Sequence, residues 1–433
     1  MSLTKPQIII LGSVGLVVVL LLLVFLGVLP GLQKDTDPKK IKAELNFWSA
    51  LQGRDAYAGI LEKLKTIYPN VTINHRDFGS VEDYEAALLD ALAAGKGPDI
   101  FAVKNNATLK EANKIYPLPQ EKFSIVDLRG AFPQVVEGDF ALNGKIYGLP
   151  PSVDTLALIY NRDILDENAI SPPQTWVDFK NAVPKLVKFD AQKNLVRAAG
   201  ALGESKNIRN VVDILSLLML QTGTEMVSEN FSNASFASPE GLEAFNFFLE
   251  FRDPKRTNYT WNTSMPNSLD AFGAGTLVMT IDYFSALKEV RARDPFLNYG
   301  VAEVPQPKEA KKIITYSNYW GLTVSKQSRY ANLAWDTIIL MTTDRGFANL
   351  YLKKTGRPPA LRTLVNNYAA DPILNVFAKQ ILVAKSWPQI DPKKIEMVFD
   401  QMIEAVNVGG VRGRDALEKA ENQVDELLSK RIF

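Results

Sequence analysis

The chain has 433 residues, of which 46% are hydrophobic, and its 49 lysines and arginines nearly balance its 48 aspartates and glutamates. The net charge of +1 gives no sign of a nucleic-acid partner, which usually requires a basic surface. Because the sequence has no cysteine and one histidine, it excludes disulfides, thiol nucleophiles, zinc–cysteine sites and two-histidine metal sites, and we expect no cofactor.

Residues 7–29 form an apolar run without a charged residue near the start of the sequence. At about 1.5 Å per residue, a helix of this length spans roughly the 30 Å hydrocarbon core of a bilayer. The alternative, a cleaved signal peptide, has a shorter apolar region and a small-x-small site, and Leu29 and Gly31 make a poor one. We therefore expect residues 1–32 to be a single-pass cell-membrane anchor with its flank and residues 33–40 to be a tether, with the binding domain outside the cytoplasm.

Apolar patterns in residues 43–103 alternate between those of strands and those of helices. The stretches AELNFWS, NVTINHRDF and PDIFAV have strand patterns, and the stretches between them have helical periodicity that ends at Pro69 and at Gly95. This order predicts an α/β fold with a parallel sheet covered on both faces. Ligands of such sheets bind beyond the carboxyl ends of the strands, where WSALQGRD and VKNNATL follow the first and third strands.

The pattern becomes mainly helical after residue 153, with SPPQTWVDFKNAV, NVVDILSLLMLQTG and PEGLEAFNFFLEFRD, and short strands return at LVMTID, NYGVAEVP and YWGLTVS. Since the chain is too long for one compact core, we expect this change to mark a second lobe. Residues 153–162 between the two regions read as one uninterrupted extended segment, longer than the usual five or six residues of a strand. We interpret this segment as a strand that crosses from one lobe to the other.

An ordered series of short motifs runs through the chain. It consists of GPDIFAV, LNGKIYGLPPSVDTLALIYNRDIL, PPQTW, AFGAGTLVMTID, NYGVAEVPQP, YWGLTVSKQSRYANLAW and TGRPPALRTL, followed by the amphipathic stretch DALEKAENQVDELL. In this order the motifs resemble the sugar-binding proteins of ABC importers that are similar to maltose-binding protein, family 1 of the extracellular solute-binding proteins. The resemblance extends from about residue 44 to the end of the chain.

The resemblance implies a two-lobed, periplasmic-binding-protein-like (type II) clamp that closes on a small ligand by a hinge motion. It implies interlobe crossings near residues 152–155, 316–323 and 370–372. The corresponding lobes are an N-lobe of residues 41–153 plus 323–370 and a C-lobe of residues 154–322 plus 371–433. The expected membrane helix departs from the secreted members of the family, which have a cleaved or lipidated signal.

Polar side chains that follow the first and third strands are the first candidates for ligand contact. They are Gln52, Arg54, Asp55, Asn105 and Asn106. Amide, carboxylate and guanidinium groups suit the hydroxyls of sugars. The alternative role of Asp55 and Asn106 is helix capping, since both stand where an N-cap would be useful.

The resemblance implies further contacts from the second lobe and from the crossings. The segments GESKNI and TIDYFS match cleft-lining segments of the family, and flat aromatic rings can stack on the apolar faces of sugars. The candidates from these regions are Asn207, Asp282, Tyr283, Phe284, Tyr319, Trp320, Arg357, Trp387 and Phe399. The alternatives left open are that aromatic rings belong to the core and that Arg357 pairs with an acid of its own lobe.

We expect a binding protein and no enzyme. The nucleophile motif G-x-S-x-G is missing, and GDFALNGKI and GAGTLV depart from the phosphate-loop and dinucleotide patterns. Aromatics and amides dominate the candidate site, which predicts a neutral oligosaccharide as the small-molecule ligand. The expected partners are the permease subunits of an ABC transporter and the lipid bilayer through residues 7–29. The alternatives are a ligand-sensing ectodomain that partners a membrane receptor, and a membrane-anchored glycan-active enzyme.

Overall fold

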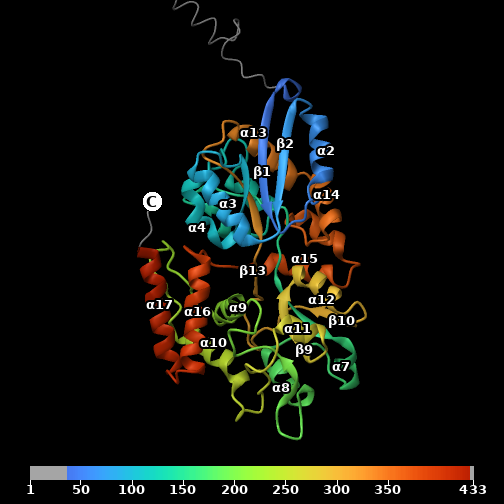
Figure 1. Ribbon diagram of the computed structural model, residues 1–433, viewed down its shortest axis with the longest axis vertical. Helices are drawn as coiled ribbons and strands as arrows, with labels where there is room; N and C mark the ends of the chain where they lie inside the picture. The colour runs from blue at the N-terminus through green and yellow to red at the C-terminus, as the bar shows by residue number, and fades with distance from the viewer. Residues whose placement is uncertain (1–36, 430–433) are drawn as a thin grey trace, which may run out of the picture.

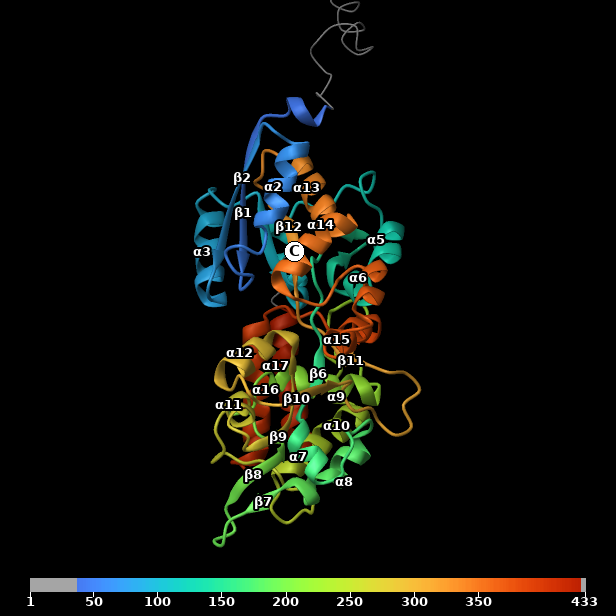
Figure 2. The ribbon, with the colours of Figure 1, turned by 90° about the vertical axis from the view of Figure 1, so that its right-hand side faces the viewer.

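The computed structural model describes residues 37–429. The predicted membrane helix at residues 7–29 therefore lies outside the described residues. Within residues 37–429, none of the helices has the length and hydropathy needed to cross a bilayer. Figures 1 and 2 show two bodies stacked along the long axis of the molecule, and we call them the N-lobe and the C-lobe.

The N-lobe is built on a sheet with the strand order β12-β3-β1-β2. Its strands are β1 (Ala43–Ala50), β2 (Val71–Phe78), β3 (Ile100–Lys104) and β12 (Trp320–Val324). β1 pairs in parallel with both β2 and β3, which confirms the three predicted N-terminal strands and their direction. β12 is antiparallel to β3, so this late strand of the chain completes the N-lobe sheet and begins before the predicted lobe boundary at residue 323.

Helices cover both faces of the N-lobe sheet, as the sequence pattern predicts. They are α2 (Ala58–Ile67), α3 (Val81–Ala93), α4 (Thr108–Glu111), α5 (Ile125–Ala131), α6 (Gln134–Phe140), α13 (Ala331–Thr343) and α14 (Arg345–Thr355). In Figure 2, α3 lies on one side of the sheet and α2, α13 and α14 lie on the other. α3 begins at Ser80, whose hydroxyl accepts a hydrogen bond from the backbone N–H of Asp83 at 3.1 Å.

The C-lobe sheet has the strand order β10-β6-β9-β8-β7. Its strands are β6 (Leu156–Asn161), β7 (Lys188–Phe189), β8 (Leu195–Gly200), β9 (Leu277–Tyr283) and β10 (Tyr299–Ala302). β8 and β9 are parallel, and the other neighbours are antiparallel. β9 is buried along its full length, including its polar residues Thr280 and Asp282.

Helices make up most of the C-lobe, and the predicted helical stretches are confirmed. They are α7 (Arg162–Glu167), α8 (Trp176–Leu186), α9 (Val211–Thr222), α10 (Pro239–Leu249), α11 (Ser268–Gly273), α12 (Leu287–Arg293), α16 (Pro392–Asn407) and α17 (Gly413–Ser429). α8 begins with a capping box, in which the Thr175 hydroxyl accepts from the Asp178 N–H and the Asp178 carboxylate accepts from the Thr175 N–H. α16 and the amphipathic α17 lie side by side (Figure 1).

The expected ten-residue strand between the lobes is shorter in the structure. β6 begins at Leu156, and α7 replaces the end of the predicted segment because the Asn161 side chain accepts a hydrogen bond from the Ile164 N–H at 3.1 Å and so caps the helix. The prediction of one uninterrupted strand was therefore wrong. The segment still links the lobes, since Ser152 bridges to Pro359 and β6 lies in the C-lobe sheet.

Each lobe has its own hydrophobic core, and the two cores meet near α15 (Leu374–Gln380). Phe377 belongs to the C-lobe core and the adjacent Ala378 to the N-lobe core. The short strands of the molecule are β4 (Ala141–Leu142), β5 (Lys145–Ile146), β11 (Thr315–Tyr316) and β13 (Ala384–Lys385). β11 pairs with β13, so the later crossings run side by side. The lobe limits remain a proposal, because α15 packs on both cores.

Candidate functional site

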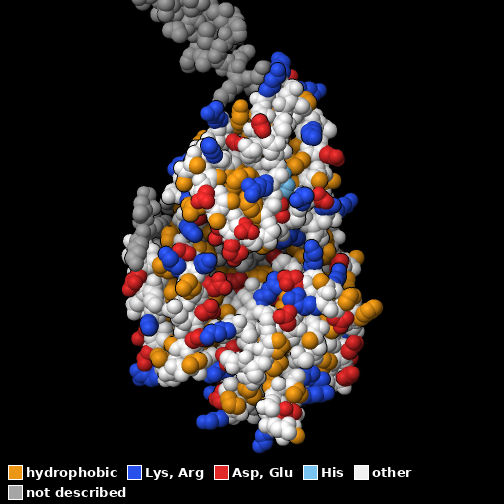
Figure 3. Space-filling view, in the orientation of Figure 1, with side chains coloured by type: hydrophobic (Ala, Val, Ile, Leu, Met, Phe, Trp, Pro, Cys, Tyr) orange, Lys and Arg blue, Asp and Glu red, His pale blue; other side chains and the backbone are white. Residues whose placement is uncertain are grey.

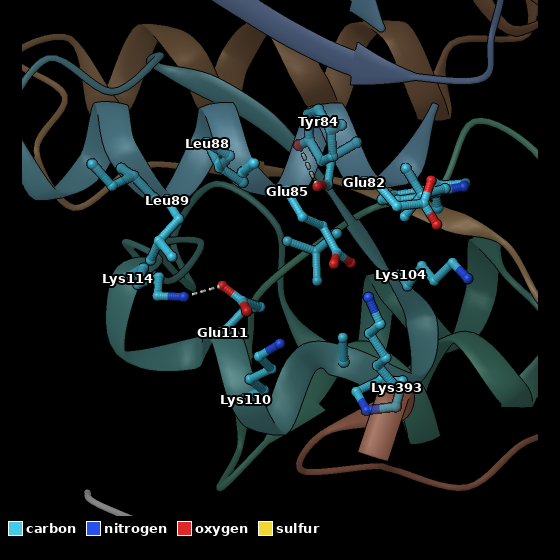
Figure 4. Close-up of a pocket in the computed structure, with 18 of the residues that line it drawn as sticks. Glu82, Tyr84, Glu85, Leu88, Leu89, Lys104, Lys110, Glu111, Lys114 and Lys393 are labelled. Atoms are coloured by element: carbon cyan, nitrogen blue, oxygen red, sulfur yellow. Dashed lines mark hydrogen bonds and ion pairs between the residues drawn. The ribbon is translucent and has the colours of Figure 1, made fainter. Parts of the chain in front are cut away.

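A groove of about 500 Å³ runs between the two lobes. Its N-lobe wall consists of α3, the end of β3, α4 and Trp320, and its C-lobe wall is the start of α16. Figure 4 shows this groove, and in Figure 3 acidic and basic side chains gather along the waist of the molecule. The charged side chains that line the groove are Glu82, Glu85, Lys104, Lys110, Glu111, Lys114, Lys393 and Glu396. Apolar side chains of α3 complete the lining, so the groove suits a ligand with both polar and apolar faces.

Trp320 is the sequence-predicted aromatic residue that lines this groove. It is the first residue of β12 and lies opposite Lys104 of β3. Its indole ring packs edge to face on Tyr84 with 5.7 Å between the centroids, and the Lys104 ammonium lies 5.9 Å from the indole centroid. Because Trp320 is only half buried, its ring can stack on the apolar face of a ligand.

The loop after β1 carries Gln52, Arg54 and Asp55. Asp77 of β2 positions this loop, because its carboxylate accepts hydrogen bonds from the backbone N–H groups of Gln52, at 3.3 Å, and of the following glycine, at 2.9 Å. The Gln52 side chain is engaged within the N-lobe, whereas Arg54 and Asp55 are exposed. Asp55 does not cap α2, since the N-cap is Tyr57 and it makes no side-chain capping bond.

Asn105 and Asn106, which follow β3, are buried and make contacts between chain segments. Asn105 donates from Nδ2 to Asp139 at 3.0 Å and accepts from the Tyr319 N–H at 3.1 Å. Asn106 donates from Nδ2 to the side-chain oxygen of Gln389 at 3.1 Å, and its carbonyl accepts from the Gln389 N–H at 2.7 Å. These amides therefore connect the N-lobe to the segments that cross the waist. Neither residue is the N-cap of a helix.

Asp139 of α6 is a member of this network that the sequence analysis missed. Its carboxylate accepts hydrogen bonds from the Tyr319 hydroxyl at 2.6 Å, from Asn105 and from the Ser386 hydroxyl. Burial raises the pKa of Asp139 to about 6, and the three donors oppose that rise. An acid inside the apolar helical stretch PQVVEGDF was the available signal, because a buried carboxylate requires partners.

Asp282 lies near the end of β9 and is buried. Its Oδ1 accepts hydrogen bonds from Asn210 Nδ2 at 2.8 Å and from the Tyr283 N–H at 2.7 Å. Its Oδ2 has no hydrogen-bond partner within the described part of the chain and lies 3.6 Å from Nε of Arg209. Burial raises the pKa of Asp282 to about 7, and the positive charge of Arg209 opposes that rise. One oxygen of this buried carboxylate therefore accepts no hydrogen bond within residues 37–429 but lies beside the charge of Arg209.

Two further carboxylates of the junction, Asp154 and Asp213, were also missed. Asp154 accepts hydrogen bonds from the backbone N–H groups of Phe284, at 2.9 Å, and of the following serine, at 3.1 Å. Asp213 accepts from the Tyr283 hydroxyl at 2.6 Å and from Asn318 at 3.2 Å. Burial raises the pKa of both carboxylates. Each interrupts an apolar run, VDTLAL or NVVDIL, which was the signal in the sequence.

Arg357 approaches the junction from the N-lobe. Its Nη2 donates a hydrogen bond to the Leu51 carbonyl at 3.1 Å, next to the loop after β1. Burial raises the pKa of Asp154, and the charge of Arg357 is the largest of the effects that lower it. Within residues 37–429 Arg357 forms no ion pair, so the alternative of an acidic partner in its own lobe is not observed. Its guanidinium therefore has no charged partner within the described residues.

Of the sequence-predicted residues, Trp320 alone lines the groove; Asn207, Trp387 and Phe399 are instead committed to contacts inside the C-lobe. Trp387 and Phe399 are 2% and 0% exposed in the C-lobe core, where the Trp387 indole N–H donates to Ser216 at 3.0 Å. Asn207 donates to two backbone carbonyls of the C-lobe and accepts from the Trp261 indole at 2.9 Å. Since these contacts stabilise the C-lobe itself, the aromatic surface of the groove is smaller than expected.

The groups that line the groove suit the binding of a small molecule. In the part of the chain that the structure describes, no group of three or more histidines, cysteines or acids is arranged to hold a metal ion. The groove offers an aromatic ring, apolar side chains and hydrogen-bonding groups of both charges, and these come from both lobes. Such a combination binds a polar small molecule through stacking and hydrogen bonds.

Comparison with known proteins identifies relatives of the chain and of its fold. The chain is 23% identical to the maltotriose-binding protein of Pyrococcus abyssi over 351 residues, which cover 79% of this chain and 72% of that protein. The structure of a cyclic alpha-maltosyl-1,6-maltose binding protein from Arthrobacter globiformis matches with a TM-score of 0.75 and 19% identity, over 90% of this chain and 99% of that chain. UgpB from Mycobacterium tuberculosis, in complex with glycerophosphocholine, matches with a TM-score of 0.71 and 15% identity over the same shares.

These structural similarities confirm the two-lobed α/β fold of the periplasmic binding proteins. A family model described as bacterial extracellular solute-binding protein matches residues 60–376, which is most of the chain. The match includes strands of both sheets and the residues that form the N-lobe wall of the groove. The family resemblance of the ordered motifs is thus confirmed, and the chain belongs to the bacterial extracellular solute-binding proteins.

Proposed function

We propose that this protein captures an oligosaccharide between its two lobes and delivers it to the permease of an ABC importer. The observation that carries the proposal is the groove of about 500 Å³ whose walls come from both lobes and which Trp320 lines. A ligand that touches both walls has a higher affinity for the closed state, and this difference drives closure. The names of the maltotriose-binding and maltosyl-maltose-binding proteins support a sugar as the ligand. The glycerophosphocholine complex makes a polyol phosphate the competing ligand class.

Within this proposal, Trp320 stacks on the sugar, and polar groups at the waist bind its hydroxyls. From the N-lobe, Arg357 forms no ion pair within the described residues. From the C-lobe, Asp282 has one carboxylate oxygen that accepts no hydrogen bond within the same part of the chain and lies 3.6 Å from Nε of Arg209. The positions that contact the ligand or support those that do are Gln52, Arg54, Asp55, Asn105, Asn106, Asp282, Tyr283, Phe284, Tyr319, Trp320 and Arg357. We leave out Asn207, Trp387 and Phe399, because their contacts lie within the C-lobe.

We also propose that residues 7–29 anchor the protein in the cell membrane. The family is extracellular, which supports an extracytoplasmic position for the binding domain. The anchor depends on the uncharged run of residues 7–29 alone, since that run lies outside the described residues. The intact mass of the protein extracted from membranes tests it. A mature N-terminus near Gln33 would contradict the anchor and leave the clamp untouched.

A thermal-shift screen tests the ligand class. Maltotriose, maltotetraose, glycerophosphocholine, inorganic phosphate, peptides and amino acids are compared, and a ligand at one hundred times its dissociation constant stabilises the fold by about 2.7 kcal/mol. We expect a neutral oligosaccharide to give this shift and Trp320→Ala to abolish it. Phe296→Ala, at a side chain that is 93% exposed, is the control that leaves the shift unchanged. If only a phosphate ester or a peptide raises the melting temperature, the sugar assignment is wrong.

A further inference from the structure

Opposite charges face each other across the groove without pairing. Within the N-lobe wall, Lys114 pairs with Glu111 at 2.7 Å. In contrast, Glu85 of α3 and Lys393 of α16 have neither an ion pair nor a side-chain hydrogen bond within residues 37–429. Figure 4 shows the Lys393 side chain extending from the C-lobe wall toward Glu85. The attraction between two such charges grows as the distance between them falls, so narrowing the groove favours their contact.

The segment that leads into α16 holds Lys393 close to the N-lobe. Gln389 donates its N–H to the Asn106 carbonyl at 2.7 Å and accepts from the Asn106 side chain at 3.1 Å, and both residues are buried. α16 then begins after its N-cap Asp391, and Lys393 lies in its first turn. Gln389 therefore contacts the N-lobe just before α16 begins. A small rotation of α16 about Gln389 would move the Lys393 ammonium toward α3.

We propose that Lys393 is a closing residue of the clamp, whose ammonium pairs with the Glu85 carboxylate when the lobes close. The pair positions the C-lobe wall over the bound ligand. Lys104 and Lys110 lie on the N-lobe wall with Glu85, so pairing of either lysine with Glu85 would not link the two lobes. This inference rests on the proposed clamp function and adds to it a specific contact of the closed state.

The proposed ion pair between Glu85 and Lys393 should change the affinity for the ligand by a small factor that depends on salt. Glu85 and Lys393 are both exposed in the structure, and an exposed ion pair changes an equilibrium by roughly one- to fivefold. We therefore expect Lys393→Glu to weaken the binding of maltotriose by about two- to fivefold at low salt. The effect should shrink at about 0.5 M salt, because the charges are then screened over a few ångströms.

Cross-linking by a carbodiimide detects the contact without depending on the identity of the ligand. The reagent joins a lysine amine to a carboxylate only when the two groups meet, and peptide mapping identifies the joined residues. We expect the full chain to yield a Lys393–Glu85 cross-link, with a higher yield when maltotriose is present. Lys393→Arg keeps the positive charge but removes the amine, so this variant should give no such cross-link.

A charge swap separates a closing role from a general effect on the fold. Lys393→Glu and Glu85→Lys should each lower the affinity for maltotriose, and the double variant should restore it to within about twofold. Lys394→Glu is the matched control, because its side chain pairs with Asp391 at 3.3 Å and does not line the groove. This control should leave the affinity unchanged, and all variants should unfold at the wild-type denaturant midpoint.

The outcomes distinguish this proposal from the proposed function. A Lys393–Glu85 cross-link that no sugar enhances supports the pair and counts against the sugar ligand. Binding of maltotriose by a protein that gives no cross-link, or that joins Lys393 only to another carboxylate, overturns the pair and leaves the binding function standing. Failure of the double variant to recover affinity also overturns it.

Discussion

At the scale of single residues, the junction between the lobes is built from buried carboxylates that accept hydrogen bonds from distant parts of the chain. Asp139, Asp154, Asp213 and Asp282 all have raised pKa values, with burial as the largest cause. The donors that face these carboxylates oppose the rise in pKa, as the Tyr319 hydroxyl does for Asp139 at 2.6 Å. These contacts form a polar layer at the waist, where the crossing segments must hold a defined geometry.

Asp139 makes the stability of the fold depend on pH. Its folded pKa, about 6, lies above its ordinary value of 3.8. Its contribution to stability is therefore fully present below pH 3.8 and is lost as the pH rises through about 6. Asp139→Asn keeps an acceptor for Tyr319 and Asn105 but carries no group that ionises. As the pH rises, the free energy of unfolding of the wild type should therefore fall relative to that of Asp139→Asn. Urea denaturation at about pH 4 and pH 7 checks this expectation.

Asp139→Ala provides the contrast to the amide substitution. It removes the acceptor for Tyr319, Asn105 and Ser386, and buried donors without partners cost about 1–3 kcal/mol. We expect this loss at both pH values. If the free energies of unfolding of wild type and Asp139→Asn change with pH in parallel, the Asp139 carboxylate does not titrate in the expected range.

Two aromatic residues test the distinction between core and groove. Phe399 is fully buried, and Phe399→Ala should lower the free energy of unfolding by about 3–5 kcal/mol. Trp320 is half buried at the groove, so Trp320→Ala should cost less stability and abolish the thermal shift caused by the ligand. Calorimetric titration with maltotriose and denaturant unfolding measure the two effects separately. The assignment fails if Phe399→Ala folds normally but no longer binds.

At the scale of elements, local rules explain where most helices begin, and tertiary contacts explain where the sequence prediction was wrong. Ser80 caps α3, and Thr175 caps α8 with a capping box, as their sequences suggest. Asn161 caps α7 in the same way, and this is why the predicted extended segment ends at β6. The extension before β6 is retained by the bridges of Ser152 to Pro359 of the N-lobe and of Thr155 to Ser317 in another crossing segment.

At Gly241 in α10, packing decides the residue type against helix propensity. A Cβ atom at this position would lie 1.9 Å from the Phe236 carbonyl oxygen. Propensity alone favours alanine in a helix by about 1 kcal/mol, but this clash with the backbone should make Gly241→Ala destabilising by about 1–3 kcal/mol. In the control Gly130→Ala, in α5, the new Cβ has no neighbour within 4 Å, and we expect a gain of about 0.5–1 kcal/mol. Urea midpoints of the two variants should shift in opposite directions.

At the scale of the whole molecule, two cores joined by crossing segments allow the lobes to move as bodies. The hydrophobic side chains fall into an N-lobe core and a C-lobe core, so rotation about the waist leaves each core intact. The groove lies at that waist, and its width depends on the angle between the lobes. In the proposed clamp, the few residues of the crossings absorb the rotation of one lobe against the other.

Closure should be visible in solution scattering. We expect saturating maltotriose to reduce the radius of gyration of the protein, because the ligand stabilises the closed state by its higher affinity for it. A solute from the thermal-shift screen that gives no stabilisation is the control, and it should leave the radius unchanged. An identical scattering envelope with and without a tightly bound sugar would count against the clamp.

The sequence by itself determined the class of the protein and the elements that depend on neighbouring residues. The alternation of apolar patterns predicted β1, β2 and β3, because hydrophobic periodicity and capping act over a few positions. The ordered motifs identified the family, since many weak local patterns in one order are together specific, and the family match over residues 60–376 confirms this. Composition also excluded disulfides and cysteine-based metal sites.

Only the tertiary structure decided which side chains meet at the waist. Asn106 and Gln389 are 283 positions apart, and no local pattern links them. Trp387 and Phe399 were expected at the ligand, but burial depends on the packing of whole lobes, which placed both in the C-lobe core. The carboxylate Asp139 looks like any other helical acid until its distant donors are seen. A site between two lobes depends on contacts between residues that are far apart in the sequence. Local periodicity along the chain does not show which of those residues meet.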